Sequence, residues 1–313
     1  MEFLLILQSI REALGEIPNN FFVALANISV APFIFIPALI IFWLISKRLG
    51  LTILFSLGIG FLINGFLKCT FCIYRPWILD SRIKPPKAIM SSATGYSFPS
   101  GHSTIAGSFW GSLFMFFRKK HLGIAIFCIA FILLTMFARM FLGVHTPQDV
   151  VVGALSGIVA AVAGFYLINK IDKKKNMDIV VWTIFTLIII CLLIYYSCKT
   201  YPMDYVEGKL LVDPKAMQID TFKGAGSAYG IFTAWLIERR FLNFEIKGSL
   251  LDKVVIALVG GFGFMLGHHI AYSLSDFIGS NSFHFISQFL LFILFMVVYP
   301  ICIQAIQNKR TAK

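Results

Sequence analysis

The chain has 313 residues, of which 58% are hydrophobic and only 13% are charged, and its mean hydropathy is +0.83. Soluble domains carry about 25% charged residues, so this composition excludes a soluble enzyme, a disordered protein and a nucleic-acid-binding domain. The net charge of +12 comes from basic residues between long apolar runs, which is the pattern of loops in a membrane protein.

The first 20 residues differ from the rest of the chain. Met1–Leu5 is apolar, but Arg11, Glu12 and Glu16 interrupt the run that follows. A signal peptide has a positive charge before its apolar part and a small-residue cleavage site after it, and neither feature is present here. We therefore expect residues 1–20 to form an amphipathic helix at the membrane interface.

The remaining sequence contains nine segments that are candidates for membrane-spanning helices, each of which needs about 20 mostly apolar residues. The nine predicted spans are Phe21–Ser46, Leu49–Leu67, Ser103–Phe117, Leu122–Ala138, Val150–Asn169, Ile179–Cys198, Gly224–Ile237, Val254–Ser275 and one within Phe285–Gln307. Two of these segments, the third and the seventh, are short. The sequence thus predicts an all-α fold, a polytopic membrane bundle of about nine spans.

The loops between the predicted spans differ in their content of lysine and arginine. One set of alternate loops is the more basic, and it includes Lys173, Lys174 and Lys175. By the positive-inside rule this set faces the cytoplasm. We therefore expect a multi-pass protein of the cytoplasmic (inner) membrane with its C-terminus inside and its N-terminal segment outside.

The predicted spans suggest three parts along the chain. Residues 1–20 are the amphipathic segment, residues 21–177 form a core that holds the polar motifs described next, and residues 178–313 form a C-terminal transmembrane extension. Residues 199–223 are expected to form an outer loop that partly covers the polar motifs.

Three cations fall at the outer ends of the predicted spans. Lys68 and Arg75 follow the second span, and Arg139 ends the fourth. Charges at a membrane are costly unless they have a function, and together these side chains can clamp a phosphate, since arginine binds it bidentately and lysine adds a point charge. Ser100 and Gly101 start the third span, where free backbone N–H groups favour an anion; taken alone, Ser100 is also a good helix cap.

Two histidines and an aspartate accompany these cations. His102 starts the third span, and His145 precedes the fifth, with Asp149 four residues further on. One imidazole can attack phosphorus while the other protonates the leaving oxygen. Asp149 can hold the tautomer of the attacking imidazole, as in a hydrolase triad, although in isolation it also fits the first turn of a helix.

The spacing Lys68-x6-Arg75-Pro76, Pro99-Ser100-Gly101-His102 and Arg139-x5-His145-x3-Asp149 resembles the three-part signature of the type 2 phosphatidic acid phosphatase superfamily. That superfamily includes lipid phosphate phosphatases, glucose-6-phosphatase and the vanadium haloperoxidases. The resemblance covers about residues 25–170. One signature position differs, because Ala138 stands where the family usually has a serine.

The resemblance implies a mechanism for these residues. His145 forms a phosphohistidine, Asp149 orients it, and His102 protonates the departing oxygen. The three cations, with Ser100 and Gly101, stabilise the charge on the phosphoryl oxygens. The resemblance also implies that no divalent metal and no other cofactor are needed.

We therefore expect a metal-independent membrane phosphatase acting at the extracytoplasmic face. Its expected partners are membrane lipids and a phosphorylated lipid substrate of the phosphatidate, phosphatidylglycerophosphate or undecaprenyl diphosphate class. The alternatives are a lipid phosphotransferase, a sugar-phosphate phosphatase, and a protein that binds or transports a phosphorylated lipid without chemistry. A haloperoxidase is disfavoured, since those relatives are typically soluble.

Two other motifs remain open. Cys69 and Cys72 form a lone CxxC, which lacks the four ligands of a zinc site but is compatible with a disulfide in an oxidising compartment. The adjacent pair His268 and His269 lies near the outer end of the eighth span. Its possible roles are helix packing, a polar contact to substrate, or a metal site, which neighbouring positions on a helix do not easily form.

Overall fold

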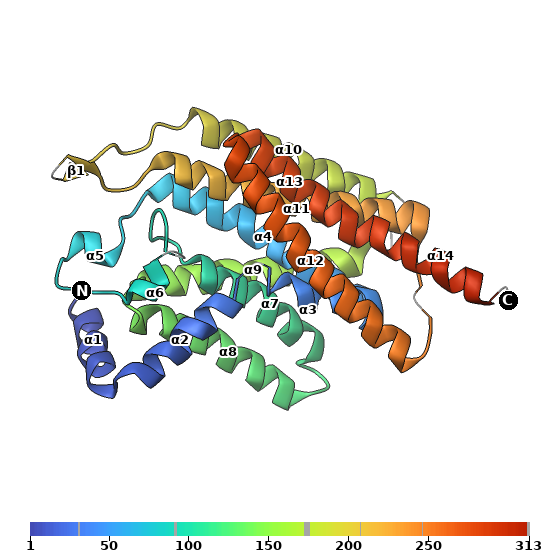
Figure 1. The fold of residues 1–313 in the computed structure, drawn as a ribbon, viewed down its shortest axis with the longest axis horizontal. Helices are drawn as coiled ribbons and strands as arrows, with labels where there is room; N and C mark the ends of the chain where they lie inside the picture. Colours follow the sequence, from blue (N-terminus) through green and yellow to red (C-terminus); the bar gives the residue numbers. More distant parts are fainter. Residues whose placement is uncertain (31, 91–92, 172–175, 207, 246, 312–313) are drawn as a thin grey trace.

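The structure is a computed structural model that describes residues 1–30, 32–90, 93–171, 176–206, 208–245 and 247–311. Over these residues the chain is almost entirely helical, apart from a hairpin of two short antiparallel strands. This architecture, drawn in Figure 1, confirms the predicted all-α class. The basic cluster Lys173–Lys175 lies outside the described residues.

The elements up to residue 171 are α1 (Glu2–Leu14), α2 (Glu16–Ile28), α3 (Phe35–Ile40), the π-helical turn η1 (Ile41–Ile45), α4 (Lys47–Phe71), α5 (Pro76–Leu79), α6 (Lys87–Met90), α7 (Gly101–Phe117), α8 (Leu122–Phe141) and α9 (Pro147–Ile171). Those that follow are α10 (Met177–Cys198), β1 (Tyr205–Val206), β2 (Lys209–Leu210), α11 (Pro214–Ile237), η2 (Glu238–Leu242), α12 (Leu250–Ile278), α13 (Asn281–Ile293), η3 (Leu294–Val298) and α14 (Tyr299–Thr311).

Helix α4 forms the centre of the bundle. It begins after Ser46, whose hydroxyl accepts a hydrogen bond from the Leu49 backbone N–H (3.2 Å). A helix that is apolar on all sides must be covered on all sides, and α4 packs against α7, α9 and α11. It ends at Cys72, which has a left-handed backbone (φ 48°). This turn places Lys68 at the same end of the bundle as Arg75.

Helices α7 and α9 are joined by close backbone contact at two glycines. A Cβ atom on Gly157 would lie 2.2 Å from the Thr104 carbonyl oxygen, and one on Gly107 would lie 2.5 Å from that of Ala154. Only glycine allows this approach. At the end of the same helix pair, the Ser100 backbone N–H donates to the carbonyl oxygen of Asp149 (2.9 Å). The first turns of α7 and α9 are therefore held side by side.

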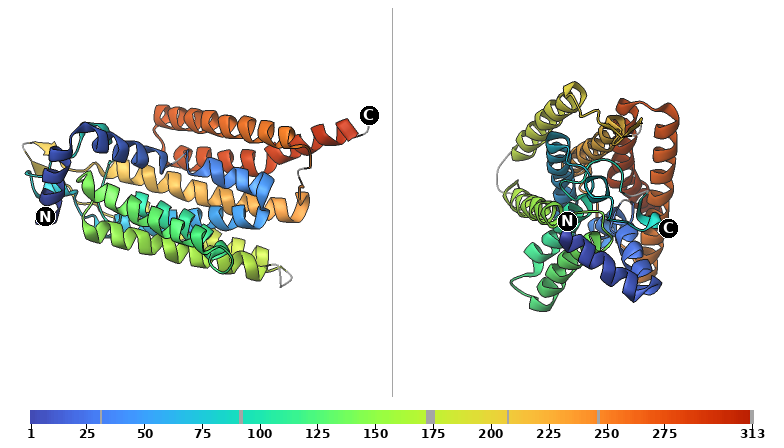
Figure 2. Two further views of the ribbon diagram at one scale, coloured as in Figure 1. Left: turned by 90° about the horizontal axis from the view of Figure 1, so that it is seen from below. Right: turned by 90° about the vertical axis from the view of Figure 1, so that its left-hand side faces the viewer.

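The C-terminal helices cover another side of α4. Helix α11 contacts α4, α10 and α13, whereas α12 lies further out against α3 and α13. Gly226 permits the contact of α11 with α13, because a Cβ atom there would lie 2.2 Å from the Phe285 carbonyl oxygen. The C-terminal extension is thus packed directly onto the central helix, with α11 as its inner member (Figure 2).

Six segments of the described chain are long and apolar enough to cross a membrane: Lys47–Leu79, Leu122–Phe141, Pro147–Ile171, Met177–Cys198, Leu250–Ile278 and Asn281–Asn308. They correspond to six of the nine predicted spans and confirm a polytopic membrane bundle. The predicted span at Ser103–Phe117 is also helical, but α7 has only 17 residues.

Two of the segments predicted after residue 20 have different boundaries in the structure. Phe21–Ser46 is not one helix, since α2 ends at Ile28 and the chain turns before α3 begins; Pro32 lies in this turn and has no N–H to continue a helix. Residues 199–223 are not one loop, since α11 begins at Pro214. Asp213 caps this helix by accepting from the Lys215 N–H (2.9 Å), and proline is favoured at a first helical position.

The N-terminal helix α1 is amphipathic, but it ends at Leu14, and residues 16–20 belong to α2. The prediction of one helix over residues 1–20 is therefore wrong in its length, because the chain turns at Gly15, which has a positive φ of 77°. Leu4 and Leu7 are buried, whereas Phe3 and Ile6 are exposed. Arg11 is buried and donates to the carbonyl oxygens of Phe141 (3.0 Å) and Lys84 (2.6 Å). Helix α1 therefore ties the loop after α5 to the end of α8, at the end of the bundle where Figure 1 places α5, α6 and β1.

The glycine contact between α7 and α9 yields a stability prediction. Gly157→Ala should lower the free energy of unfolding by about 1–3 kcal/mol, because the added Cβ overpacks two backbones. Thermal unfolding of the purified protein in detergent measures this effect. Gly123→Ala is the matched control, since nothing lies within 4 Å of a Cβ atom there. Equal stability of the two variants would contradict the packing argument.

Candidate active site

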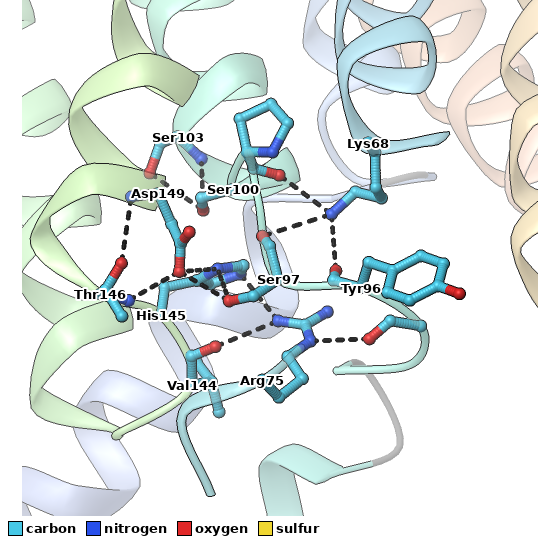
Figure 3. A network of polar contacts seen from close by, with 12 residues as sticks. Lys68, Arg75, Tyr96, Ser97, Ser100, Ser103, Val144, His145, Thr146 and Asp149 are labelled. Carbon is cyan, nitrogen blue, oxygen red and sulfur yellow. Dashed lines mark hydrogen bonds and ion pairs between the residues drawn. The ribbon is translucent and has the colours of Figure 1, made fainter. Parts of the chain in front are cut away.

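All three parts of the predicted signature meet at one end of the bundle (Figure 3). Lys68 lies on the last turn of α4 and Arg75 just before α5; His102 lies on the first turn of α7. Arg139 lies on the last turn of α8, and His145 and Asp149 flank the start of α9. Residues up to 81 positions apart in the sequence therefore form one polar cluster, as their positions at helix ends predict.

The Lys68 ammonium binds the loop that precedes α7. Its Nζ donates to the carbonyl oxygens of Tyr96 and Pro99, both at 2.9 Å. Carbonyl oxygens that point into a buried site need a donor, and Lys68 supplies it. The lysine therefore shapes the loop in addition to placing a positive charge in the site.

Arg75 is buried and has several partners. Its Nε donates to the Gly95 carbonyl oxygen (3.1 Å), Nη2 to that of Thr94 (2.8 Å) and Nη1 to that of Val144 (3.1 Å). The same Nη1 lies 2.9 Å from Nε2 of His145. Because a guanidinium can only donate, Nε2 must be the accepting, unprotonated nitrogen. The proton of a neutral His145 is therefore on Nδ1.

The Nδ1 side of His145 faces a serine and an aspartate. Nδ1 lies 3.5 Å from Oδ2 of Asp149 and 3.3 Å from the hydroxyl of Ser97. Ser97 in turn donates to Oδ2 of Asp149 (2.6 Å), as does the Thr146 backbone N–H (2.7 Å). Asp149 thus caps α9 through its contacts with Thr146; its predicted role in orienting His145 stays a prediction, which the nearby Nδ1 of His145 makes geometrically possible.

Ser97 is a site residue that the motif analysis did not single out. It lies within the loop between the first and second signature parts, and its side chain is completely buried. Nothing in its local sequence marks it as a bridge, because its two partners come from the third part of the signature, about 50 residues later.

Ser100 acts mainly as a helix cap. Its hydroxyl accepts from the Ser103 N–H (3.4 Å), and its own backbone N–H is already bonded to Asp149. Ser100 and Gly101 are both predicted to present backbone amides to phosphate. Only Gly101 lines the cavity of about 360 Å³ that adjoins these residues. The phosphate-binding role predicted for the Ser100 amide would require this hydrogen bond to break.

Arg139 differs from the other two cations. Its side chain is completely buried, and none of its three guanidinium nitrogens has a hydrogen-bond partner among the described residues. It interacts electrostatically with Arg75, His102 and His145. Nε2 of His102 is also buried without a partner in the described part of the chain. Such groups are costly to bury unpaired, and an oxyanion bound here would satisfy them.

A cavity of about 360 Å³ opens onto this cluster. Lys68, Arg75, His102 and His145 line one side of it. The other side comes from the C-terminal helices, through residues that include Met217, Asp220 and Lys223 of α11 and His268 and Tyr272 of α12. Met217, Asp220 and Lys223 belong to the segment 199–223 that is expected to cover the motifs, and His268 is one of the histidines for which a substrate contact is left open. The sequence does not predict that helices α11 and α12 form this wall, because they are distant in sequence and carry no part of the signature.

Two further points concern metals and cysteines. Among the described residues, no three His, Cys, Asp or Glu side chains lie close enough together to hold a metal ion. Cys69 and Cys72 are both buried and carry free thiols in this structure. The Cys72 thiol instead donates to the Cys69 carbonyl oxygen (3.0 Å).

Residues 49–173 match the family model described as the PAP2 superfamily. Residues 49–173 are called the PAP2 segment below. The resemblance that the signature indicates is thereby confirmed, and the PAP2 segment contains every predicted site residue.

The chain is similar to three curated phosphatases. It is 28% identical over 127 residues to undecaprenyl-diphosphatase of Sulfolobus acidocaldarius, covering 40% of this chain and 59% of that protein. It is 30% identical over 133 residues to phosphatidylglycerophosphatase B of Bacillus subtilis (40% and 59%). It is 30% identical over 119 residues to lipid A 4'-phosphatase of Bacteroides thetaiotaomicron (37% and 51%).

The chain thus spans about half to three fifths of the length of these relatives. No solved structure matches it. The helices α10–α14 lie outside the PAP2 segment, although three of them, α11, α12 and α13, complete the wall of its cavity.

The environment of His145 predicts its protonation state. Burial, together with the positive charges of Arg75, Arg139 and Lys68, lowers the pKa of this imidazole well below its usual range. A lowered pKa favours the neutral form, so His145 should stay neutral at pH 6, with its proton on Nδ1. Nitrogen NMR of ¹⁵N-histidine-labelled protein, assigned with His145→Gln, measures both properties. A charged imidazole at pH 6 would contradict this expectation.

The unpaired guanidinium of Arg139 predicts a conflict between stability and binding. Arg139→Met should raise the free energy of unfolding of the ligand-free protein by about 1–4 kcal/mol, because it removes a buried charge without a partner. The same variant should lose the rise in melting temperature that vanadate, a phosphate analogue, gives the wild type.

The matched control is Arg82→Met. Arg82 is exposed and pairs with Asp80 and Glu2, so its loss should change stability by at most about 0.5 kcal/mol and preserve the vanadate effect. An Arg139→Met protein that is less stable and still responds to vanadate would overturn the assignment of an anion site.

Proposed function

We propose that this protein is a metal-independent membrane phosphatase that hydrolyses a phosphorylated lipid or isoprenoid through a phosphohistidine. The observation that carries the proposal is the buried, unpartnered guanidinium of Arg139, which interacts electrostatically with His102 and His145, two residues that line a cavity. The arrangement combines an oxyanion site, an unprotonated imidazole nitrogen and a second imidazole for proton transfer. The three curated relatives act on phosphorylated lipids or isoprenoids by name.

In the first step, the lone pair of His145 Nε2 forms a bond to phosphorus while the bond to the ester oxygen breaks. The departing oxygen takes a proton from His102. Arg139, Lys68 and Arg75 stabilise the charge that develops on the three other phosphoryl oxygens. Nη1 of Arg75 lies 2.9 Å from Nε2 of His145. The phosphoryl group must therefore displace this contact, after which Arg75 donates to a phosphoryl oxygen instead.

In the second step, His102 accepts a proton from water, which attacks phosphorus and breaks the bond to His145. Inorganic phosphate leaves and both imidazoles return to their starting states. Asp149 and Ser97 keep the Nδ1 proton of His145 in place during both steps, as an aspartate does in a hydrolase triad.

The proposal extends to location and domain roles. Lys47, Arg118 and Arg239, which belong to the more basic loops, lie at the end of the bundle opposite the site, so the positive-inside rule supports an active site that faces the extracytoplasmic side. Residues 21–177 then form the catalytic core, and residues 178–313 an extension that completes its cavity.

Phosphate release by the purified protein in detergent with EDTA tests the proposal. The panel contains phosphatidate, phosphatidylglycerophosphate, undecaprenyl diphosphate and glucose 6-phosphate. At least one lipid substrate should release phosphate, and His145→Ala should lower the rate by at least about 10³-fold, because it removes the nucleophile. His121→Ala is the matched control, since His121 is exposed at the start of α8.

Several outcomes would contradict the proposal. Full activity of His145→Ala excludes the phosphohistidine, and loss of activity in EDTA excludes metal independence. Transfer of phosphate to an added lipid or sugar without free phosphate identifies a phosphotransferase. Preference for glucose 6-phosphate identifies a sugar-phosphate phosphatase, and vanadate binding without turnover identifies a binding protein.

A further inference from the structure

The cavity at the PAP2 site shares part of its wall with a second hollow. A groove of about 400 Å³ runs along the outside of α12, and two residues, His268 and Tyr272, line both the cavity and the groove. The other residues that line the groove are Pro32, Phe33, Phe262, Met265, Leu266 and His269. One helix therefore has the phosphate cavity and an apolar groove as its immediate neighbours.

The groove faces the surroundings of the bundle. Helix α12 crosses α3 on the outside of the molecule (Figure 1), and it is one of the six membrane-crossing segments. Phe33, Phe262 and Leu266 are 47%, 64% and 48% exposed. Because a bilayer surrounds this part of the chain, the groove opens to hydrocarbon.

The shared wall is polar on the side of the cavity. Nζ of Lys223, which lines the cavity, lies 3.7 Å from the centre of the Tyr272 ring, a cation–π contact. The same ammonium lies 3.5 Å from Oδ1 of Asp276, one turn further along α12. Lys223 thus holds the Tyr272 ring between the cavity and the groove. The residues on the cavity side of this ring include charged ones, and those on the groove side are mostly apolar.

We propose that the groove along α12 binds the hydrocarbon chain of the phosphorylated lipid, with the chain entering past His268 and Tyr272. The path from Lys68 and Arg75 through the cavity to the groove changes from charged to apolar, as a lipid phosphate does from its phosphate end to its hydrocarbon end. This inference rests on the proposed function, which supplies the phosphate end. It also assigns a role to the C-terminal extension, which selects the chain while the PAP2 segment performs the chemistry.

Photo-labelling tests where the chain lies. The probe is hexadecyl phosphate with a diazirine at the tenth carbon, added to the full-length protein in phosphatidylcholine vesicles. Labelled peptides should contain Phe262–Leu266 or Pro32–Phe33. Leu266→Trp should suppress this labelling, because the indole fills the groove. Leu258→Trp should preserve it, since Leu258 is exposed on the same helix but does not line the groove.

Labelling spread over the lipid-facing helices, or unaffected by Leu266→Trp, would overturn the proposal. So would a wild-type protein that is labelled mainly on α8–α10. Because labelling requires no turnover, it reports on the groove even if the proposed phosphatase activity fails.

Chain-length dependence gives an independent measurement. Leu266→Trp should lower kcat/KM for hexadecyl phosphate by roughly tenfold, the loss expected when a few methylene groups are no longer buried. It should leave kcat/KM for butyl phosphate unchanged, and Leu258→Trp should change neither value. Equal loss on both substrates indicates damage to the site and contradicts a chain-binding groove. Absence of hydrolysis by the wild type, with labelling still in the groove, refutes the proposed function alone.

Discussion

The active-site geometry depends on two cations that hold a loop of carbonyl oxygens. Lys68 donates to the carbonyl oxygens of Tyr96 and Pro99, and Arg75 donates to those of Thr94 and Gly95. The bound loop carries Ser97, which donates to Asp149 and thereby positions His145. Removing either positive charge would leave buried carbonyl oxygens without donors. Part of the signature thus has a structural role, in addition to the phosphate binding proposed for its charges.

Arg139 completes this division of labour. Lys68 and Arg75 donate hydrogen bonds to carbonyl oxygens of the protein. The guanidinium of Arg139 has no such partner among the described residues, so all of its donors are available to a ligand. An unpaired buried charge is tolerable only because the rest of the bundle is well packed, with α4 covered on all sides and α7 and α9 in backbone contact. The free energy gained by this packing offsets the cost of holding an unpaired charge in a preorganised site.

The sequence predicts some levels of this structure better than others. The convergence of Lys68, His102 and Arg139 follows from motifs placed at the ends of apolar helices, since alternate ends share one side of a membrane. The break near Pro32 and the helix at 214–223 are missed, because apolar content does not resolve turns within a run or helices that carry charge. Ser97 and the cavity wall of α11 and α12 depend on contacts between distant segments, which leave no local pattern.

The position of α11 and α12 has an evolutionary consequence. The residues that would break the phosphoester bond belong to a segment shared with a large superfamily, while the opposite wall of the cavity comes from helices outside it. Mutations in the outer helices can therefore alter which molecule fits without disturbing the reactive groups. A lineage that acquires or exchanges such helices can explore new substrates at little risk to its chemistry, because the reactive groups and the opposite cavity wall reside in separate parts of one chain.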